Sequence, residues 1–516
     1  MDTASVQSII LGDLGAKPTM LRPMVTTTAV TAALILLAGC GGDDKKSDSG
    51  SENKGGETTT SATPSAPAVP SFDPPKAFAP AAAYPVMRDK EHQFSEEKSQ
   101  SGIAGQVALI GRWTGLTGHD VADPNKTWTI KSAEAETTKV TDATKPVAVK
   151  VDGKDVALVA YTESDKGNGT QKPSGLVVVH WVDVMTGQKV AEVAAKVSTL
   201  QGTGDTAAGT PNVAGVAYDP ETGQVAVGVS LMGSVSKYQT VYADPKTQKS
   251  TILPGLSPAA VHEGVVAGAP GPADPGGSAG TVVLADGASG KVTKQIPLKQ
   301  ASLKPLAAGA KHAYFYGDKD SAYDSGTKGQ AIFVVDLSTG AVTQTEPAPP
   351  SDSNVEVECL ADQATAVVCT TGTVQGSSLG IVGFDDATGK KAWGYTEDSG
   401  GRVVPRVTAA FHGVVYAQTE AQPVLLDAKT GQDLPSASSS SSPGSSETPS
   451  SGDTPSESDS PTGNESPGNG DLGLFNGKMA SPAAVSAYGG VYGQSPSGDT
   501  GSVDLESVCI FLKPTA

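Results

Sequence analysis

Short runs of β-branched and aromatic residues, separated by polar turns, recur along the chain between residues 101 and 435. Residues 176–182, 331–335 and 379–384 are three of these runs. Runs of this length that are bounded by turn residues are typical of β-strands. Long helical periodicity is absent outside an N-terminal apolar segment, and the chain is rich in Gly. The pattern therefore predicts an all-β fold.

A polar turn of one form recurs seven times: Asp, two residues, Thr or Ser, and then a closing residue. The six copies that close with Gly begin and end at Asp183 and Gly187, Asp219 and Gly223, Asp286 and Gly290, Asp336 and Gly340, Asp385 and Gly389, and Asp427 and Gly431. The seventh begins at Asp244 and closes with Gln248. An Asp in a turn accepts hydrogen bonds from backbone N–H groups, and a closing Gly adopts positive φ without a steric clash. The repeat therefore predicts a repeated tight hairpin.

The spacing of these turns indicates the architecture. If Asp219 marks an earlier hairpin of the Asp244 unit, the other six turns lie 61, 42, 50, 49 and 42 residues apart. A period of about 40–50 residues with four strands per unit is typical of a β-propeller, whereas a β-sandwich has no reason to repeat one turn at one period. The candidate units are approximately 145–197, 212–252, 258–298, 305–347, 353–396 and 403–435.

Two looser units flank these six, at about 103–131 and 480–512. If the terminal strands share one blade, the ring has seven four-stranded blades. If each terminal unit builds its own blade, the ring has eight. The sequence leaves both counts open.

Residues 1–40 have the pattern of an export signal. An apolar stretch at 30–37 follows Arg22 and precedes Cys40, and it is shorter than the roughly 20 residues of a membrane-spanning helix. Residues 37–40, Leu-Ala-Gly-Cys, resemble the lipobox of bacterial lipoproteins, in which the Cys is lipidated and becomes the mature N-terminus. A plain secretory signal with an incidental Cys is the alternative. Residues 1–19 are unlike the start of a signal, so we expect translation to begin at Met20 or Met24.

Composition divides the rest of the chain. Residues 41–100 are rich in Ser, Pro, Ala and Gly, and we expect a disordered tether there. Residues 101–435 hold the blades, and residues 471–516 supply the C-terminal strands that close the ring. Between them, residues 436–470 form a low-complexity acidic Ser/Pro insertion, which we interpret as a tolerated loop expansion with partner docking as the alternative.

The repeat resembles that of the PQQ-like (pyrroloquinoline-quinone-dehydrogenase-like) propellers, whose units have a short strand, Asp-x-x-Thr-Gly-Lys and then a Trp. Residues 384–393 are the best copy and end in Trp393. In that family the Trp helps to dock adjacent blades. Only Trp128 and Trp393 stand near the expected position, so the resemblance implies that smaller residues pack the other blade joints. Trp181 lies before its turn rather than after it.

Cys359 and Cys369 lie in two predicted strands on either side of a turn at residues 361–364. Ten residues apart across such a hairpin, the two sulfurs can meet, and an exported protein experiences oxidising conditions. We predict a disulfide, with two buried thiols that face opposite ways as the alternative. Cys509 would then remain unpaired and buried in the last strand.

The remaining chemistry is sparse. A formal net charge of −18 disfavours a nucleic-acid partner. Residues 276–280 match a nucleophile-elbow pattern but lie in a Pro/Gly-rich loop, and Asp318, Asp320 and Asp324 lack the spacing of a helix–loop–helix calcium site. The His residues are scattered singly, and we expect them at surface or capping positions; they are His92, His119, His180, His262, His312 and His412. No catalytic, metal or cofactor residue is assigned.

Quinone dehydrogenases of the resembling family use an adjacent Cys pair, which this chain lacks. The sequence therefore favours a non-catalytic propeller, lipid-anchored on the outer face of the cytoplasmic membrane, that binds a protein or another cell-envelope component. The family includes a propeller lipoprotein that scaffolds outer-membrane protein assembly, of which only the fold and the anchor carry over. The alternatives are a quinoprotein or other secreted enzyme, and an extracellular sensor or solute-binding module.

Overall fold

All regular structure in the described part of the chain is β-strand. The computed structural model describes residues 69–86, 100–123, 125–132, 138–165, 170, 174–197, 211–231, 237–271, 280–318, 330–345, 355–373, 378–397, 399, 401–420, 422–435, 480–494 and 507–516. The chain divides into two units, Met1–Pro64 and Ser65–Ala516, and every described residue belongs to the second. No helix long and apolar enough to cross a bilayer occurs among these residues.

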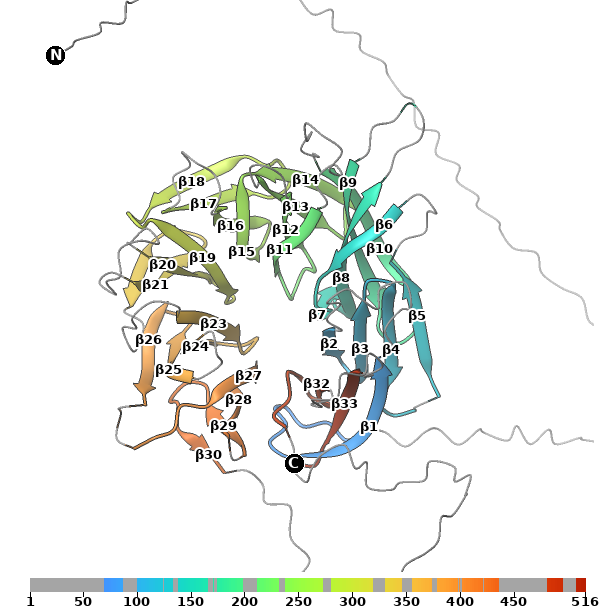
Figure 1. The fold of residues 1–516 in the computed structure, drawn as a ribbon, viewed down its shortest axis with the longest axis vertical. Coiled ribbons are helices and arrows are strands. Elements are labelled where there is room, and N and C mark those ends of the chain that lie inside the picture. Colours follow the sequence, from blue (N-terminus) through green and yellow to red (C-terminus); the bar gives the residue numbers. More distant parts are fainter. Residues whose placement is uncertain are drawn as a thin grey trace, which may run out of the picture. The chain divides into compact units, whose positions relative to one another are not determined.

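The strands form eight antiparallel sheets, blades 1 to 8, that are arranged radially about one axis (Figure 1). Blade 1 contains β2 (Gln100–Ala104), β3 (Val107–Arg112), β4 (Gly115–Asp120) and β5 (Thr127–Lys131). Blade 2 contains β6 (Thr138–Ala143), β7 (Val147–Val151), β8 (Lys154–Asp165), β9 (Ser174–Asp183) and β10 (Lys189–Val197). Blade 3 contains β11 (Pro211–Tyr218), β12 (Val225–Leu231), β13 (Lys237–Asp244) and β14 (Lys249–Pro254). Blade 4 contains β15 (Leu256–His262), β16 (Val265–Pro270), β17 (Thr281–Asp286) and β18 (Val292–Pro297).

The remaining blades follow the same order from the axis outward. Blade 5 contains β19 (Ser302–Ala308), β20 (His312–Asp318), β21 (Ala331–Asp336) and β22 (Val342–Thr345). Blade 6 contains β23 (Val355–Ala361), β24 (Ala366–Thr373), β25 (Ser378–Asp385) and β26 (Lys390–Thr396). Blade 7 contains β27 (Arg406–Phe411), β28 (Val414–Gln418), β29 (Pro423–Asp427) and β30 (Asp433–Leu434). Blade 8 contains β31 (Ala484–Ser486), β32 (Gly489–Gln494), β33 (Ser507–Pro514) and, as its outermost strand, β1 (Phe78–Val86).

The all-β propeller is confirmed, and the blade count is eight. Blades 2 to 7 overlap the six candidate units in order. Residues 100–131 build a complete blade of their own, whereas β1 pairs with β33 at the other end of the chain, from Phe78 opposite Pro514 to Val86 opposite Ser507. The ring is therefore closed by one N-terminal and three C-terminal strands, and neither terminal unit is left incomplete.

The chain enters the ring earlier than composition predicts. We expected a disordered tether to extend to residue 100, but β1 lies within that segment, and residues 69–77 also contact the ring. The Pro- and Ala-rich sequence of β1 has no clear strand periodicity. It forms a strand because it pairs with β33. The signal region and Cys40, most of the tether and the 436–470 insertion lie outside the described residues.

The ring has two different faces. In each four-stranded meander, the connections between the first and second strands and between the third and fourth strands lie at the same end. We call this end of the ring the turn face, and the opposite end the loop face. The six Asp turns at Asp183, Asp244, Asp286, Asp336, Asp385 and Asp427 join third to fourth strands, and Asp219 joins β11 to β12, so all seven copies lie on the turn face.

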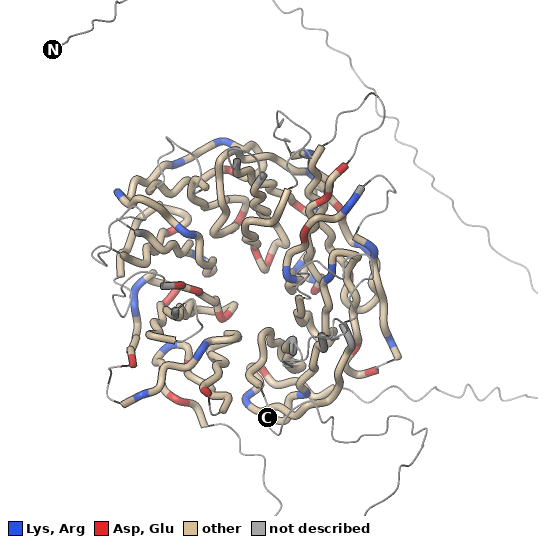
Figure 2. The backbone as a smooth tube through the Cα atoms, viewed as in Figure 1, with Lys and Arg blue, Asp and Glu red and all other residues tan. Residues whose placement is uncertain are grey.

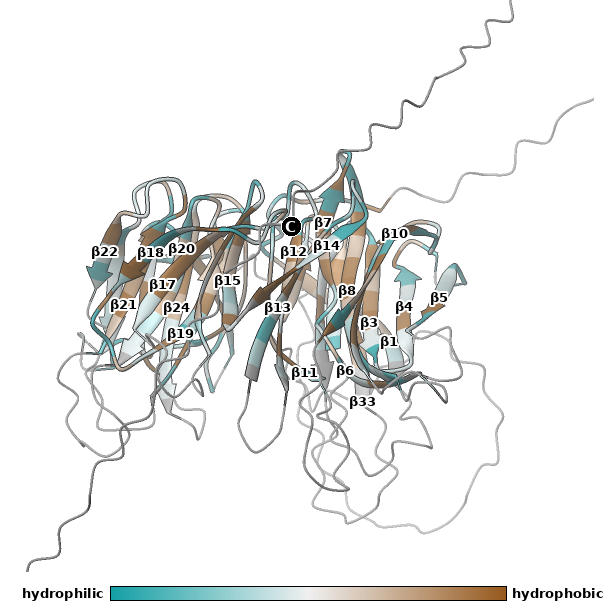
Figure 3. Cartoon of the chain, turned by 90° about the horizontal axis from the view of Figure 1, so that it is seen from above, coloured by the Kyte–Doolittle hydropathy of each residue, from teal (hydrophilic) through white to brown (hydrophobic). Residues whose placement is uncertain are grey.

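Apolar side chains fill the spaces between neighbouring blades. Trp181 is fully buried between blades 2 and 3 among valines of both sheets, and Phe315 and Phe333 are buried between blades 4 and 5. Figure 3 shows hydrophobic residues concentrated within the sheets and hydrophilic residues at the hairpin turns. Burial of apolar surface contributes about 25 cal/mol per Å² to stability. Each blade gains this contribution only when the neighbouring blades cover its faces.

Candidate functional site

The Asp side chains accept hydrogen bonds from groups within their own turns. Asp183 Oδ1 accepts hydrogen bonds from the amides of Met185 (3.0 Å) and Thr186 (2.9 Å) and from the Thr186 hydroxyl (2.9 Å). Gly187 N then donates to Asp183 O at 2.9 Å. The other turns repeat this closing bond, with lengths of 2.8–2.9 Å. These carboxylates are therefore part of the turn structure.

Two turn carboxylates show how strongly this arrangement favours the ionised form. At Asp336, burial raises the pKa, but hydrogen bonds from Thr339 and Ser338 outweigh this effect and lower the pKa to about 2. At Asp286, hydrogen bonds from the Ser289 hydroxyl and amide lower the pKa of the carboxyl group. The closing residue has positive φ in every copy, including Gln248 at 52°, which occupies the Gly position without a Gly.

Tryptophans from one blade dock onto the turn of the next. Trp393 Nε1 donates to Ala428 O in blade 7 at 2.8 Å, and Trp128 Nε1 makes the same bond to Val184 O in blade 2 at 2.8 Å. The rings cover the closing Gly: a Cβ on Gly431 would lie 2.3 Å from Trp393 Cε3. Glycine is required here by close approach as well as by positive φ.

Two further joints use smaller side chains that bind carbonyl oxygens of the neighbouring turn. Thr251 Oγ1 of blade 3 donates to Ala288 O in the turn of blade 4 at 2.8 Å. Lys294 Nζ of blade 4 donates to Thr339 O in the turn of blade 5. Trp181 also docks a neighbour, because its Nε1 donates to Gly223 O of blade 3 at 2.7 Å. The sequence pattern had set Trp181 apart, since it precedes its own turn.

A buried polar cluster joins blades 5 and 6. His312 Nδ1 lies 3.4 Å from Asp386 Oδ1, which also accepts from the Tyr314 hydroxyl at 3.0 Å. Lys311 N donates to Asp386 Oδ2 at 3.0 Å. Burial lowers the pKa of His312, but the hydrogen bond and charge of Asp386 outweigh burial and raise the pKa overall.

The expectation that the His residues occupy surface or capping positions is wrong for His312 and for His180, which are 5% and 1% exposed. His180 Nε2 lies 3.4 Å from Glu192 Oε2 within blade 2. Both side chains are buried by neighbouring sheets, which single-residue context does not reveal. His92 lies outside the described residues.

The predicted Cys359–Cys369 disulfide is confirmed. The two residues are direct cross-strand partners on β23 and β24. Cys509 is free and buried, and burial raises the pKa of its thiol to about 12. Of the other motifs considered, residues 276–279, Asp320 and Asp324 lie outside the described residues, and Asp318 is the last residue of β20.

A channel with a volume of about 530 Å³ lies along the ring axis. The inner strands of several blades and their turn-face connections line it, and alanine is its commonest lining residue, for example at Ala217, Ala259, Ala307, Ala409 and Ala484. Small side chains at these positions leave the axis open. A concave space of this size is typical of small-molecule sites.

Most charged groups at the channel wall are already paired. Lys150 Nζ lies 3.2 Å from Glu221 Oε1. Asp362 is buried, and its oxygens accept backbone amides, including Ala364 N at 2.9 Å and Gly413 N of blade 7 at 3.0 Å. Figure 2 shows both signs of charge interspersed along the backbone of the ring.

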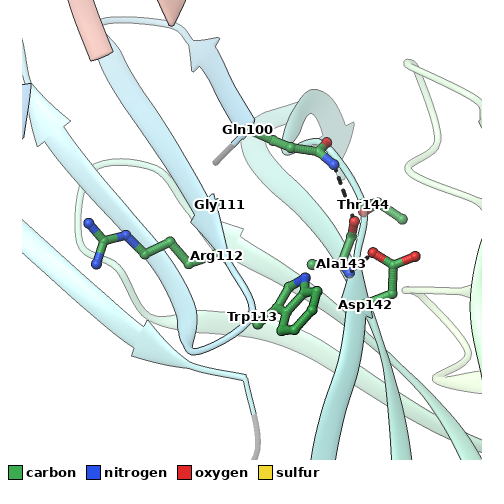
Figure 4. Close-up of a pocket in the computed structure, with 7 residues that line it drawn as sticks. All are labelled: Gln100, Gly111, Arg112, Trp113, Asp142, Ala143 and Thr144. Atoms are coloured by element: carbon green, nitrogen blue, oxygen red, sulfur yellow. Dashed lines mark hydrogen bonds between the residues drawn. The ribbon is translucent and has the colours of Figure 1, made fainter. Parts of the chain in front are cut away.

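A smaller cavity, of about 120 Å³, lies where blade 1 meets blade 2 (Figure 4). Gln100 Nε2 donates to Ala143 O at 3.4 Å, whereas the Arg112 guanidinium points away from the other labelled side chains. Asp142 Oδ1 accepts from Ala143 N at 2.8 Å, and its Oδ2 accepts from Val213 N of blade 3 at 3.1 Å. The one carboxylate here holds blades together, so the axial channel is the better candidate site.

A second sequence repeat, different from the Asp turns and not recognised from the sequence, lines the channel. Pro or Thr followed within two residues by Ala-Ala recurs on inner strands at 258–260, 305–308 and 408–410, and again at 482–484, where β31 begins. Inner strands also carry a repeated register shift, as between Pro258 and Ala260 and between Val407 and Ala409. The alanine pairs were the available signal for the channel wall.

Comparison with known proteins gives no family. No protein-family model matches the chain, and no curated protein matches it. Among solved structures, BamB from Moraxella catarrhalis is 13% identical, with a TM-score of 0.34 over 70% of this chain and 88% of that chain. The β-propeller domain of the Trilobed protease from Pyrococcus furiosus is 13% identical, with a TM-score of 0.31 over 59% and 84%. At these values the likenesses add no argument, and the fold assignment rests on strand pairing.

Proposed function

We propose that this chain is a lipid-anchored extracytoplasmic propeller that binds a cell-envelope partner and has no reaction centre of its own. Residues 37–40 support the anchor, and Cys40 is the residue that would carry the lipid. The radial fold supports the binding role, because a propeller presents connections from every blade around one axis. The place of action is the outer face of the cytoplasmic membrane.

The observation that carries this proposal is the attachment of residues 69–77 to one face of the ring. Residues 69–77, which we call the strap, cross the turn face at the joint of blades 7 and 8. Phe72 N donates to Ala487 O at 2.8 Å, and Lys76 N donates to Ala516 O at 2.6 Å. The Tyr416 hydroxyl donates to Pro75 O at 2.7 Å, and His412 contacts the Asp73 carboxylate. A tether from Cys40 therefore joins the ring at a fixed point beside the channel.

Fractionation of bacterial cells that express the full chain or Cys40→Ala tests the anchor. We expect the wild-type chain to pellet with membranes and to incorporate labelled palmitate, because acylation supplies the membrane affinity. Cys40→Ala should lose the label and leave the membrane pellet after processing. A wild-type chain that is processed yet unlabelled would contradict the anchor.

Cross-linking in intact envelopes tests the binding role. A photoreactive residue replaces Gln363 on the turn face in one variant and Val292 on the outer strand β18 in a matched variant, since both positions are exposed. We expect one discrete cross-linked protein from at least one position, with its yield depending on the position. Absence of any cross-linked partner from either position would count against a scaffolding role.

The channel favours one second candidate, an extracellular solute-binding or sensing module. Its volume and its alanine lining suit a small ligand rather than a protein. A solute-binding module would bind a small ligand in the absence of any macromolecular partner, whereas a scaffold for a cell-envelope partner would not require such a ligand.

A further inference from the structure

The inner strand of blade 2 is broken in the middle of the channel wall. β6 and β7 both pair with β8, with Ala143 opposite Tyr161 and Val147 opposite Leu158. Residues 144–146 therefore stand opposite only residues 159–160. Thr144 N donates to Ala160 O at 2.8 Å, and Ala160 N donates to Thr144 Oγ1 at 2.9 Å, which fixes the break. Such breaks re-aim a side chain away from the sheet.

The re-aimed side chain is Lys145. It lines the channel, and its Nζ donates to Ala483 O of blade 8 at 3.0 Å, past blade 1. Gly102 of blade 1 permits this approach, because a Cβ there would lie 2.3 Å from Pro146 O. The single-residue register shifts of inner strands lie at uncharged residues, for example Ala259 in β15, Thr408 in β27 and, within blade 2 itself, Thr141 in β6. Blade 2 has an additional interruption at residues 144–146, and this interruption carries a cation.

Lys145 has no acidic partner among the described residues, because no carboxylate oxygen there lies within 4.0 Å of its Nζ. Asp155, one of the carboxylates that line the channel, stands opposite Lys150, five residues along the chain from Lys145. Lys150 itself is paired with Glu221. Among the described residues that line the channel, Lys145 is therefore a cation without a carboxylate partner.

The environment of this ammonium group is partly dehydrated. Lys145 is accessible to solvent inside the channel, but the ring surrounds it, and this desolvation lowers the pKa of its amine. An ammonium has three N–H donors, and one carbonyl accepts only one of them. The channel around this group is lined mainly by uncharged residues, of which alanine is the commonest.

We infer that the axial channel binds a small solute that carries an anionic oxygen group, a carboxylate or a phosphate, and that Lys145 binds this group. An anion at this position completes the hydrogen bonding of the ammonium and compensates its charge. The alanine-lined wall takes the uncharged remainder of the solute, and the volume of about 530 Å³ admits a molecule of metabolite size. The inference does not depend on the lipid anchor.

Calorimetric titration of the full chain carrying Cys40→Ser tests this inference with three probes: succinate, inorganic phosphate and, as an uncharged control, glycerol. We expect saturable binding of at least one anion and none of glycerol. Lys145→Gln should weaken that binding at least tenfold. Lys150→Gln is the matched control, since its cation is already paired, and it should change binding less than threefold.

A second measurement covers the case in which Lys145→Gln fails to fold. Reductive ¹³C-methylation gives each lysine its own NMR signal, and the signal lost in Lys145→Arg identifies Lys145. During anion titration this signal should shift and saturate with the calorimetric affinity. Failure of both anions to bind the wild-type chain, equal binding by Lys145→Gln, or a Lys145 signal that moves no more than those of exposed lysines would each overturn the inference. None of these outcomes bears on acylation of Cys40.

Discussion

The outer turns and the inner strands of the blades use repetition in opposite ways. The outer turns repeat their residues so faithfully that Asp183, Asp336 and Asp427 make the same hydrogen bonds, and other polar groups of these turns are bound by the preceding blade. The inner strands share little more than alanine pairs, and they leave a channel open. The conspicuous repeat therefore holds the ring together, whereas the departure from the weaker repeat, at Lys145, points to a binding role.

The largest effect should come from adding a side chain to a turn that packs against a tryptophan of the neighbouring blade. Gly431→Ala places a methyl group against Trp393 at positive φ, and we expect a loss of about 3 kcal/mol in the free energy of unfolding. Gly413→Ala is the matched control: its φ is 86°, but no atom lies within 4 Å of its added Cβ, so strain alone should cost about 1 kcal/mol. Urea denaturation measures both. Equal losses would show that the tryptophan contact does not hold the joint.

A somewhat smaller effect is expected from the hairpin beside the channel. Replacing Cys359 and Cys369 together with Ser removes the disulfide, and closure of a ten-residue loop predicts a loss of about 2.5 kcal/mol. Cys509→Ser, which replaces a buried thiol that is not part of a disulfide, is the control and should cost less. Thermal unfolding with and without reductant gives the comparison. An unchanged melting temperature for the double variant would contradict a stabilising disulfide.

The turn carboxylates predict a pH dependence. Because hydrogen bonds lower the pKa of Asp336 to about 2, its contribution is present above the ordinary Asp pKa and is lost as the pH falls through about 2. Asp336→Asn should therefore be less stable than wild type at pH 7, by about 1 kcal/mol after solvent screening of this partly exposed group. The difference should shrink between pH 4 and pH 2. A constant difference across that range would exclude the carboxylate charge as the cause.

The smallest effect on stability belongs to the channel lysine. Lys145→Gln keeps a donor for Ala483 O and removes a charge that pairs with no described carboxylate, so the free energy of unfolding should change by less than about 0.5 kcal/mol. Denaturation of this variant beside Gly431→Ala measures the contrast between the two regions. A loss as large as that of Gly431→Ala would make Lys145 a structural residue.

Sequence reasoning found the elements that local chemistry specifies. The Asp turns, their period and the disulfide hairpin depend on residues within a few positions of one another, so single-sequence patterns contain them. The eighth blade was left open because its outer strand, Phe78–Val86, pairs with Ser507–Pro514 more than 400 residues later. No local pattern specifies such a pairing.

The candidate site was less predictable for the same reason. Residues 144–146 look like the beginning of a unit, and only the pairing of β6 and β7 with one strand shows that they interrupt it. Asp386 follows a recognised turn residue, but its role depends on Tyr314 and Lys311 of the preceding blade. Contacts between blades depend on how the blades are arranged in the ring, and the position of a residue in the sequence does not predict these contacts.

Closure of the ring by β1 is the claim on which the channel, the strap and the tether position all depend. Tyr84 is the direct partner of Cys509, so Tyr84→Cys places a second thiol opposite the native one. We predict that mild oxidation of this variant yields a disulfide-linked peptide pair by mass spectrometry, whereas Ala83→Cys, on the opposite side of the strand, yields none. A Tyr84→Cys chain that folds with both thiols free to alkylation would contradict the closed ring.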